Sequence, residues 1–191
     1  MRGYMPKVIF LDTETTSVDT ERCGMYQVSG IIDIDGKTVE EFNVFSDIFS
    51  DDLVEESAFA KNGYTLAKIH QLPYPLKAFS AFCNMLRKHV DQYDKLDKFI
   101  VVGYMADFDN RVLRQWFLKN GSKFFGAYFW VPWIDVMQLA MYILQDKRHE
   151  MENFKLITVA KFVGLPADEN QNHDALYDAK MTRDLYYELA K

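Results

Sequence analysis

A short apolar run that ends in two acids constrains the fold of this chain most. Residues 8–11 are apolar and partly β-branched, and Asp12 and Glu14 follow almost at once. Such a run beside a turn cluster is typical of a strand buried on both faces. Alternate residues of a strand share a face, so Phe10, Asp12 and Glu14 point the same way. Crowded carboxylates repel each other and lose hydration, and a cation such as Mg²⁺ or Mn²⁺ removes both costs. Equally, the two acids can cap the loop that follows.

The remaining pattern predicts an α/β fold. Residues 27–34 and 38–45 read as strands joined by the hairpin signal Asp35-Gly36. Residues 99–102 and 128–133 predict two further strands. Apolar periodicity predicts helices at about 54–61, 75–90, 108–117, 136–144, 156–163 and 174–189. Antiparallel strands followed by alternating helices and strands indicate a mixed sheet with helices packed on it.

Length and composition narrow the class of protein. The 191 residues suit a single domain, because domains usually span ~100–200 residues. The net charge of −6 argues against nucleic-acid binding by charge alone. Cys23 and Cys83 are too few for a disulfide framework or a four-ligand zinc site. The chain has no apolar segment long enough for a membrane span or secretory signal, so we expect a cytoplasmic protein without a membrane partner.

Further acids lie near the starts of predicted helices. Asp178 borders a stripe of small residues in the last helix, and Asp107 and Asp109 open the helix after residue 103. Asp107 is the natural N-cap of that helix. The helix dipole or capping can explain each of these acids without a metal. His173 precedes Asp178 by five residues, and an imidazole near a metal ligand is suited to act as a general base.

Three segments together resemble the motifs of the DEDDh 3′–5′ exonucleases of the ribonuclease H-like superfamily. They are FLDTETT at 10–16, GYMADFDNRVL at 103–113 and HDALYDA at 173–179. The second motif selects Asp109 and leaves Asp107 as the cap. The DTETT form is most similar to the proofreading subunit of the bacterial replicative polymerase. Ser17, Asn62 and Tyr104-Met105 differ from the residues that many members carry at these positions.

The resemblance implies one exonuclease domain over residues 1–191, with a ribonuclease H-like mixed β-sheet flanked by helices. It also implies two divalent cations, Mg²⁺ or Mn²⁺, and a general base, His173. The metal ligands it implies, which are also catalytic, are Asp12, Glu14, Asp109 and Asp178.

The expected substrate is the 3′ end of a nucleic acid, DNA rather than RNA and single-stranded, trimmed to nucleoside monophosphates. Thr13, Thr15 and Thr16 are expected to hold the terminal nucleotide. Tyr64 is a candidate for stacking on a base, although it could equally pack its own loop. A polymerase or another replication or repair protein is a candidate partner.

Three other functions are compatible with the pattern in part. An RNA-trimming 3′–5′ exoribonuclease would use the same site and differ in its response to a 2′-OH. A non-enzymatic nucleic-acid module would be favoured by loss of a ligand or of the histidine, and all five positions are filled here. A metal-dependent phosphatase would cleave a small phosphomonoester, and nothing in the sequence favours it.

Overall fold

A mixed five-stranded sheet forms the centre of the molecule. The computed structural model describes residues 6–168 and 174–191. The strand order is β3-β2-β1-β4-β5, with β1, β2 and β3 antiparallel and β4 and β5 parallel to β1. The strands are β1 (Lys7–Thr15), β2 (Met25–Ile34), β3 (Lys37–Phe45), β4 (Ile100–Gly103) and β5 (Ile134–Asp135).

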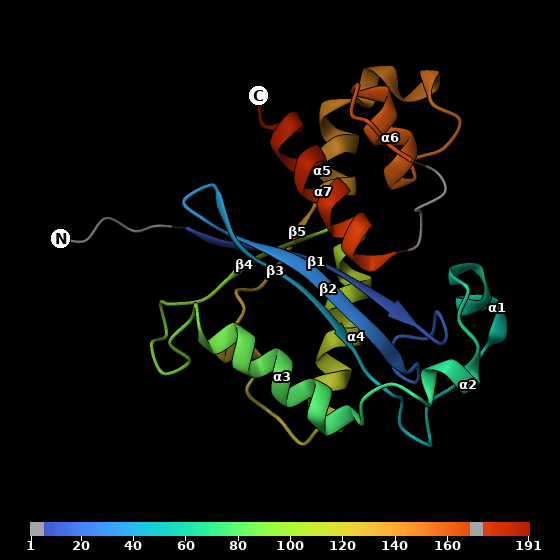
Figure 1. Cartoon of the computed structure of the whole chain (residues 1–191). Helices are drawn as coiled ribbons and strands as arrows, with labels where there is room; N and C mark the ends of the chain where they lie inside the picture. Colours follow the sequence, from blue (N-terminus) through green and yellow to red (C-terminus); the bar gives the residue numbers. More distant parts are fainter. Residues whose placement is uncertain (1–5, 169–173) are drawn as a thin grey trace.

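Helices cover both faces of this sheet (Figure 1). The helices are α1 (Glu56–Phe59), α2 (Leu66–Ile69), α3 (Pro75–Arg87), α4 (Ala106–Lys119), α5 (Val136–Ile143), α6 (Leu156–Phe162) and α7 (Ala175–Leu189). Helices α3 and α4 lie against one face, and α5, α6 and α7 lie against the other. The predicted α/β class, a ribonuclease H-like mixed sheet flanked by helices, is confirmed. None of the helices in the described residues is long and apolar enough to cross a membrane.

Strand β1 alternates between the two layers, as its sequence predicts. Ile9 and Leu11 are buried in the core under α3 and α4. Phe10 belongs to the core on the opposite face, where its ring meets Tyr186 of α7 edge-on at 5.6 Å between centroids. Phe10 of β1 pairs with Val102 of β4, and Gly103 of β4 pairs with Asp135 of β5, so β1 continues past the ends of both strands and carries Asp12 and Glu14 beyond them.

Local sequence signals explain most element boundaries. In the hairpin between β2 and β3, Asp35 and Gly36 both adopt positive φ, 53° and 72°. This is the geometry that Asp-Gly favours in a two-residue turn. Pro75 opens α3, where its missing N–H costs nothing.

The strand predicted at 128–133 is wrong. Phe125–Ala127 forms a 3₁₀ turn, and Phe129 makes only an isolated bridge to Phe99. Pro132 lacks the N–H that a strand ladder needs, and the fifth strand, β5, forms just after it. The predicted helix at 54–61 is also shorter than expected, because α1 gives way to the 3₁₀ turn Ala60–Asn62.

Candidate metal centre

The end of β1 presents two of the predicted acids. Asp12 and Glu14 are half-buried, whereas Thr13 between them is buried. The strand continues to Thr15, so Asp12 and Glu14 are part of its regular alternation and not caps of the following loop. Both therefore project on the face that α7 covers.

Asp109 reaches this edge from the first turn of α4. It is 2% exposed, and its Oδ1 accepts hydrogen bonds from the Thr13 amide at 3.0 Å and the Thr13 hydroxyl at 2.7 Å. The prediction that Asp107 caps this helix is wrong. Met105 occupies the N-cap position with a left-handed φ of 60°, and Asp107 lies in the first turn, exposed and paired with Arg111 at 2.8 Å. Asp109 is therefore the acid that turns toward β1.

Helix α7 brings Asp178 to the same edge. Its N-cap, Asp174, accepts hydrogen bonds from the amides of Leu176 and Tyr177, each at 3.0 Å. Ala175 and Ala179 are fully buried beside Asp178, so the helix backbone approaches the sheet closely.

The pKa values report how crowded these acids are. The pKa of Asp12 is raised well above its usual value by burial, and then by Asp109, Asp178, Glu14 and Asp174 in that order. Each of these four acids acts electrostatically on Asp12. The structure therefore brings together the four carboxylates that the sequence selects.

Burial dominates at Glu14 and Asp109 as well. It raises the pKa of Glu14 to about 8, against a lowering by the hydrogen bond from Asn62. It raises the pKa of Asp109 to about 7, against a lowering by the two hydrogen bonds from Thr13. Within the described ranges, no Lys, Arg or His forms an ion pair with Asp12, Glu14 or Asp109. The fold thus concentrates negative charge here, and the donors to Glu14 and Asp109 in the described part of the chain, Asn62 and Thr13, are neutral.

The chemistry of these side chains suits a hard divalent cation, because every candidate ligand is a carboxylate oxygen. As the side chains stand, no three acidic, histidine or cysteine residues among 6–168 and 174–191 are grouped closely enough to hold a metal ion. Hydrogen bonds to neutral partners hold Glu14 and Asp109 in their present orientations. Binding a cation therefore requires the four carboxylates to draw closer together, which Glu14 can do through its Oε1 while Asn62 keeps hold of Oε2.

The predicted substrate residues divide between buried and half-buried positions. Thr16 is fully buried, and its hydroxyl donates to the Leu53 carbonyl at 2.6 Å and accepts from the Gly24 amide. The Thr15 hydroxyl donates to the Ser17 carbonyl at 2.8 Å. Tyr64 is half-buried and stacks on Phe45, and Glu14 and Asp174 contribute to raising its pKa after burial does. Tyr64 therefore lies at the rim of the acidic cluster.

His173, the predicted general base, lies outside the described residues. Its sequence neighbour Asp174 is described and caps α7 next to the carboxylates. The role of His173 stays a prediction.

Asn62 is a site residue that the sequence singled out only as a departure from the family pattern, with no role assigned to it. Its side-chain amide donates to Glu14 Oε2 at 2.8 Å. Its local sequence, Asn62-Gly63, indicates a turn. The contact joins residues 48 positions apart, so periodicity and local spacing do not reveal it.

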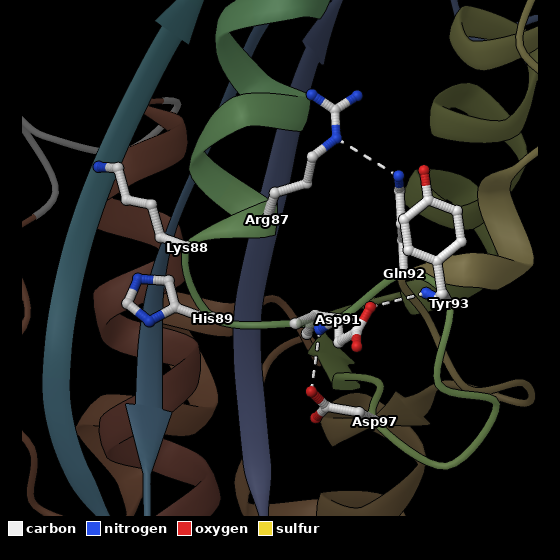
Figure 2. Close-up of a pocket in the computed structure, with 8 residues that line it drawn as sticks. Arg87, Lys88, His89, Asp91, Gln92, Tyr93 and Asp97 are labelled. Carbon is white, nitrogen blue, oxygen red and sulfur yellow. Dashed lines mark hydrogen bonds between the residues drawn. The ribbon is translucent and has the colours of Figure 1, made fainter.

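An open pocket of about 440 Å³ at the end of α3 lies apart from the carboxylates (Figure 2). Its polar groups bond to one another. The Asp91 amide donates to Asp97 at 2.9 Å, the Tyr93 amide donates to Asp91 at 3.0 Å, and Arg87 donates to Gln92 at 3.3 Å. This internal pairing favours a structural role for the pocket.

Comparison with known proteins decides the family. Residues 9–186 match the RNase_T family, described as Exonuclease. The chain belongs to this exonuclease family. The predicted class, a 3′–5′ exonuclease of the DEDD superfamily, is thereby confirmed at the level of the family, and metal dependence is typical of its members. No curated protein sequence matches the chain.

Solved structures of E. coli exonuclease I share the fold of this exonuclease domain. A complex with a dT13 oligonucleotide has a TM-score of 0.74 and 18% identity, and the match covers 97% of this chain and 41% of that one. A zinc-bound complex of the same enzyme with single-stranded DNA has a TM-score of 0.75 and 19% identity, covering 98% and 41%. The chain thus spans about two fifths of the length of these neighbours. The expected similarity to a polymerase proofreading subunit stays a prediction.

Proposed function

We propose that this chain is a metal-dependent exonuclease that removes nucleoside monophosphates from the 3′ end of single-stranded DNA. The observation that carries the proposal is the convergence of Asp12, Glu14, Asp109 and Asp178. Burial raises the pKa of Asp12, and the charges of Asp109, Asp178 and Glu14 raise it further. A bound cation would offset this repulsion while leaving the carboxylates ionised.

The roles of the residues follow from their positions and from the family motifs. Asp12, Glu14, Asp109 and Asp178 would hold two Mg²⁺ or Mn²⁺ ions. When bound, these ions stabilise charge on the attacking and leaving oxygens and lower the pKa of the attacking water. His173 would accept the proton of that water. Thr13 holds Asp109 in place through its amide and hydroxyl.

The same edge of the sheet has an open pocket that could receive the 3′ end of a single-stranded DNA. An open pocket of about 440 Å³ lies beside the loop between β4 and α4, and Val18, Met105 and Arg111 are among its lining residues. Val18 and Met105 are 80% and 56% exposed, so apolar surface is available to bases. Thr13, Thr15, Thr16 and Tyr64 are proposed to surround the terminal nucleotide. For Thr15 and Thr16 that contact would come through the backbone, because their hydroxyls bond within the protein.

A degradation ladder tests the proposal. A single-stranded DNA labelled at its 5′ end should shorten one nucleotide at a time with Mg²⁺ or Mn²⁺, and EDTA should stop the reaction. His173→Ala should lower kcat by ~10²–10⁴-fold if the histidine is the base. Degradation that persists in EDTA, or starts at the 5′ end, would overturn the assignment.

The choice of DNA over RNA is tested separately. The DNA oligonucleotides bound to exonuclease I in the neighbouring structures support DNA. Matched DNA and RNA oligomers of one sequence should show faster trimming of the DNA. Faster trimming of the RNA would identify an exoribonuclease instead. The polymerase or repair partner, the cytoplasmic location and the single domain stay predictions.

A further inference from the structure

Asn62 links the acidic edge to the core of the molecule. Its side-chain Nδ2 donates to Glu14 Oε2 and to the Tyr26 hydroxyl, each at 2.8 Å. A primary amide nitrogen carries two hydrogens. Both are therefore used, one on a candidate metal ligand and one on a residue of the core.

The Tyr26 end of this link is rigid. Tyr26 is fully buried in a cluster with Ile48, Phe59 and Ile69. Its ring meets Phe59 edge-on at 6.5 Å between centroids. The hydroxyl that accepts from Asn62 therefore has a fixed position in the fold.

The backbone also places Asn62 at this point. It is the last residue of the 3₁₀ turn Ala60–Asn62, which ends at Gly63 with a left-handed φ of 70°. Glycine adopts this conformation without the steric cost that a Cβ imposes. The chain can reverse directly after Asn62, so the side chain is held between the turn and β1.

We propose that Asn62 is a positioning residue that orients Glu14 toward the bound divalent cation. This inference rests on the proposed function. The amide holds one oxygen of the carboxylate, Oε2, and so presents the other, Oε1, to the ion. Asparagine suits the role because it is neutral. A Lys or Arg at this position would neutralise Glu14 and compete with the metal.

Direct metal binding tests the proposal without relying on activity. We would titrate Mn²⁺ calorimetrically into the wild-type protein and into Asn62→Ala. Loss of a partner that orients a metal ligand typically weakens metal binding by ~10–100-fold, and we expect a change in Kd of that size. Asn62→His, which keeps a ring N–H donor, should recover part of the affinity.

A matched control separates positioning from general stability. Asn153 also makes two side-chain hydrogen bonds, accepting from the Lys155 amide at 3.0 Å and the Thr158 hydroxyl at 2.7 Å beside α6. Asn153→Ala should lower the melting temperature and leave the Kd for Mn²⁺ unchanged. Should Asn62→Ala fail to fold, Tyr26→Phe keeps the ring and removes the anchoring hydroxyl. It should weaken Mn²⁺ binding by about threefold.

The outcomes distinguish the two proposals. If the wild-type protein binds Mn²⁺ and trims DNA, and Asn62→Ala or Tyr26→Phe has the same Kd, the positioning role is overturned. If the wild-type protein neither binds Mn²⁺ nor trims DNA, the proposed function fails and the inference fails with it.

Discussion

Two buried carboxylate environments at opposite ends of β1 behave differently. Asp33 of β2 lies opposite Val8 near the start of β1 and is fully buried. It accepts hydrogen bonds from Thr38 at 2.8 Å, and from Arg183 and Tyr187 of α7 at 2.9 Å each. At the other end of the same strand, burial raises the pKa of Asp12, and the neighbouring acids Asp109, Asp178, Glu14 and Asp174 raise it further.

The two ends differ in the source of the positive charge that can balance a carboxylate. At Asp33 the protein provides its own cation, Arg183, and the carboxylate fixes α7 to β2. At Asp12 and Glu14, the described part of the protein provides no cation. A buried carboxylate without a counter-charge is costly. The acidic end is thus suited to binding an ion, whereas the Asp33 end is suited to holding the helix that carries Asp178.

The largest effect is expected at Asp12. Asp12→Asn removes a metal ligand while keeping the shape of the side chain, so exonuclease activity should fall by at least about 10³-fold. The same change relieves repulsion, so the metal-free variant should melt at a higher temperature than metal-free wild type. Rate assays with Mn²⁺ and thermal melts in EDTA measure the two effects. A lower melting temperature would show that the acids are not crowded.

Substitution of Asp33 is expected to lower stability and to leave metal binding nearly unchanged. Asp33→Asn weakens the bonds to Arg183 and Tyr187 and leaves a buried cation without its partner. The free energy of unfolding should fall by about 2–4 kcal/mol, less than for a fully enclosed pair because the Arg183 side chain is 25% exposed. Urea unfolding measures the loss. The Kd for Mn²⁺ of the folded protein should change little, and a large change would undo the contrast between the two ends.

The acidic end of β1 should also make stability depend on pH. Glu14 has a pKa of about 8 and Asp109 of about 7 in the folded chain, whereas free carboxyl groups titrate near pH ~4. The folded protein therefore binds more protons than the unfolded chain between these limits. Metal-free stability should be highest near pH ~4–5 and fall as the pH rises through 7 and 8. Unfolding curves at pH 5.5 and 8 in EDTA measure this fall, and added Mn²⁺ should largely remove it. A metal-free stability that rises with pH in this window contradicts the pKa assignments.

The smallest effect on activity is expected for Tyr64, at the rim of the acidic cluster. Tyr64→Leu keeps an apolar contact with Tyr26 and Phe45 but removes an aromatic surface for a base. Base stacking is worth about 1–3 kcal/mol, so KM for single-stranded DNA should rise by about 5–100-fold with kcat nearly unchanged. Steady-state kinetics measure KM and kcat separately. An unchanged KM would leave Tyr64 as a residue that only packs its loop.

The sequence was most informative where a charged residue follows an apolar segment. Acids at the end of an apolar strand are unexpected, so Asp12 and Glu14 could be identified before the fold was known. Asp109 was harder to separate from Asp107, because both open the same helix. Only the family motif distinguished them, and the structure shows why the capping argument failed. The left-handed Met105 takes the cap position and moves Asp107 into the first turn.

Long-range polar contacts could not be predicted. Asn62 and Glu14 are 48 residues apart, and Arg183 and Asp33 are 150 apart. Neither pair follows a helical or strand period. The fifth strand was misplaced for a different reason. Aromatic residues with strand propensity occupy 128–130, but Phe129 is buried in the core and the regular ladder begins only after Pro132.

A bound divalent cation is expected to compensate the negative charge at the acidic end of β1. A crystal soaked in Mn²⁺ and measured at an anomalous wavelength tests it most directly. Two anomalous peaks about 3.5–4 Å apart are expected among Asp12, Glu14, Asp109 and Asp178. Crystals that show no peak at these carboxylates, with their side chains unmoved in saturating Mn²⁺, would contradict it.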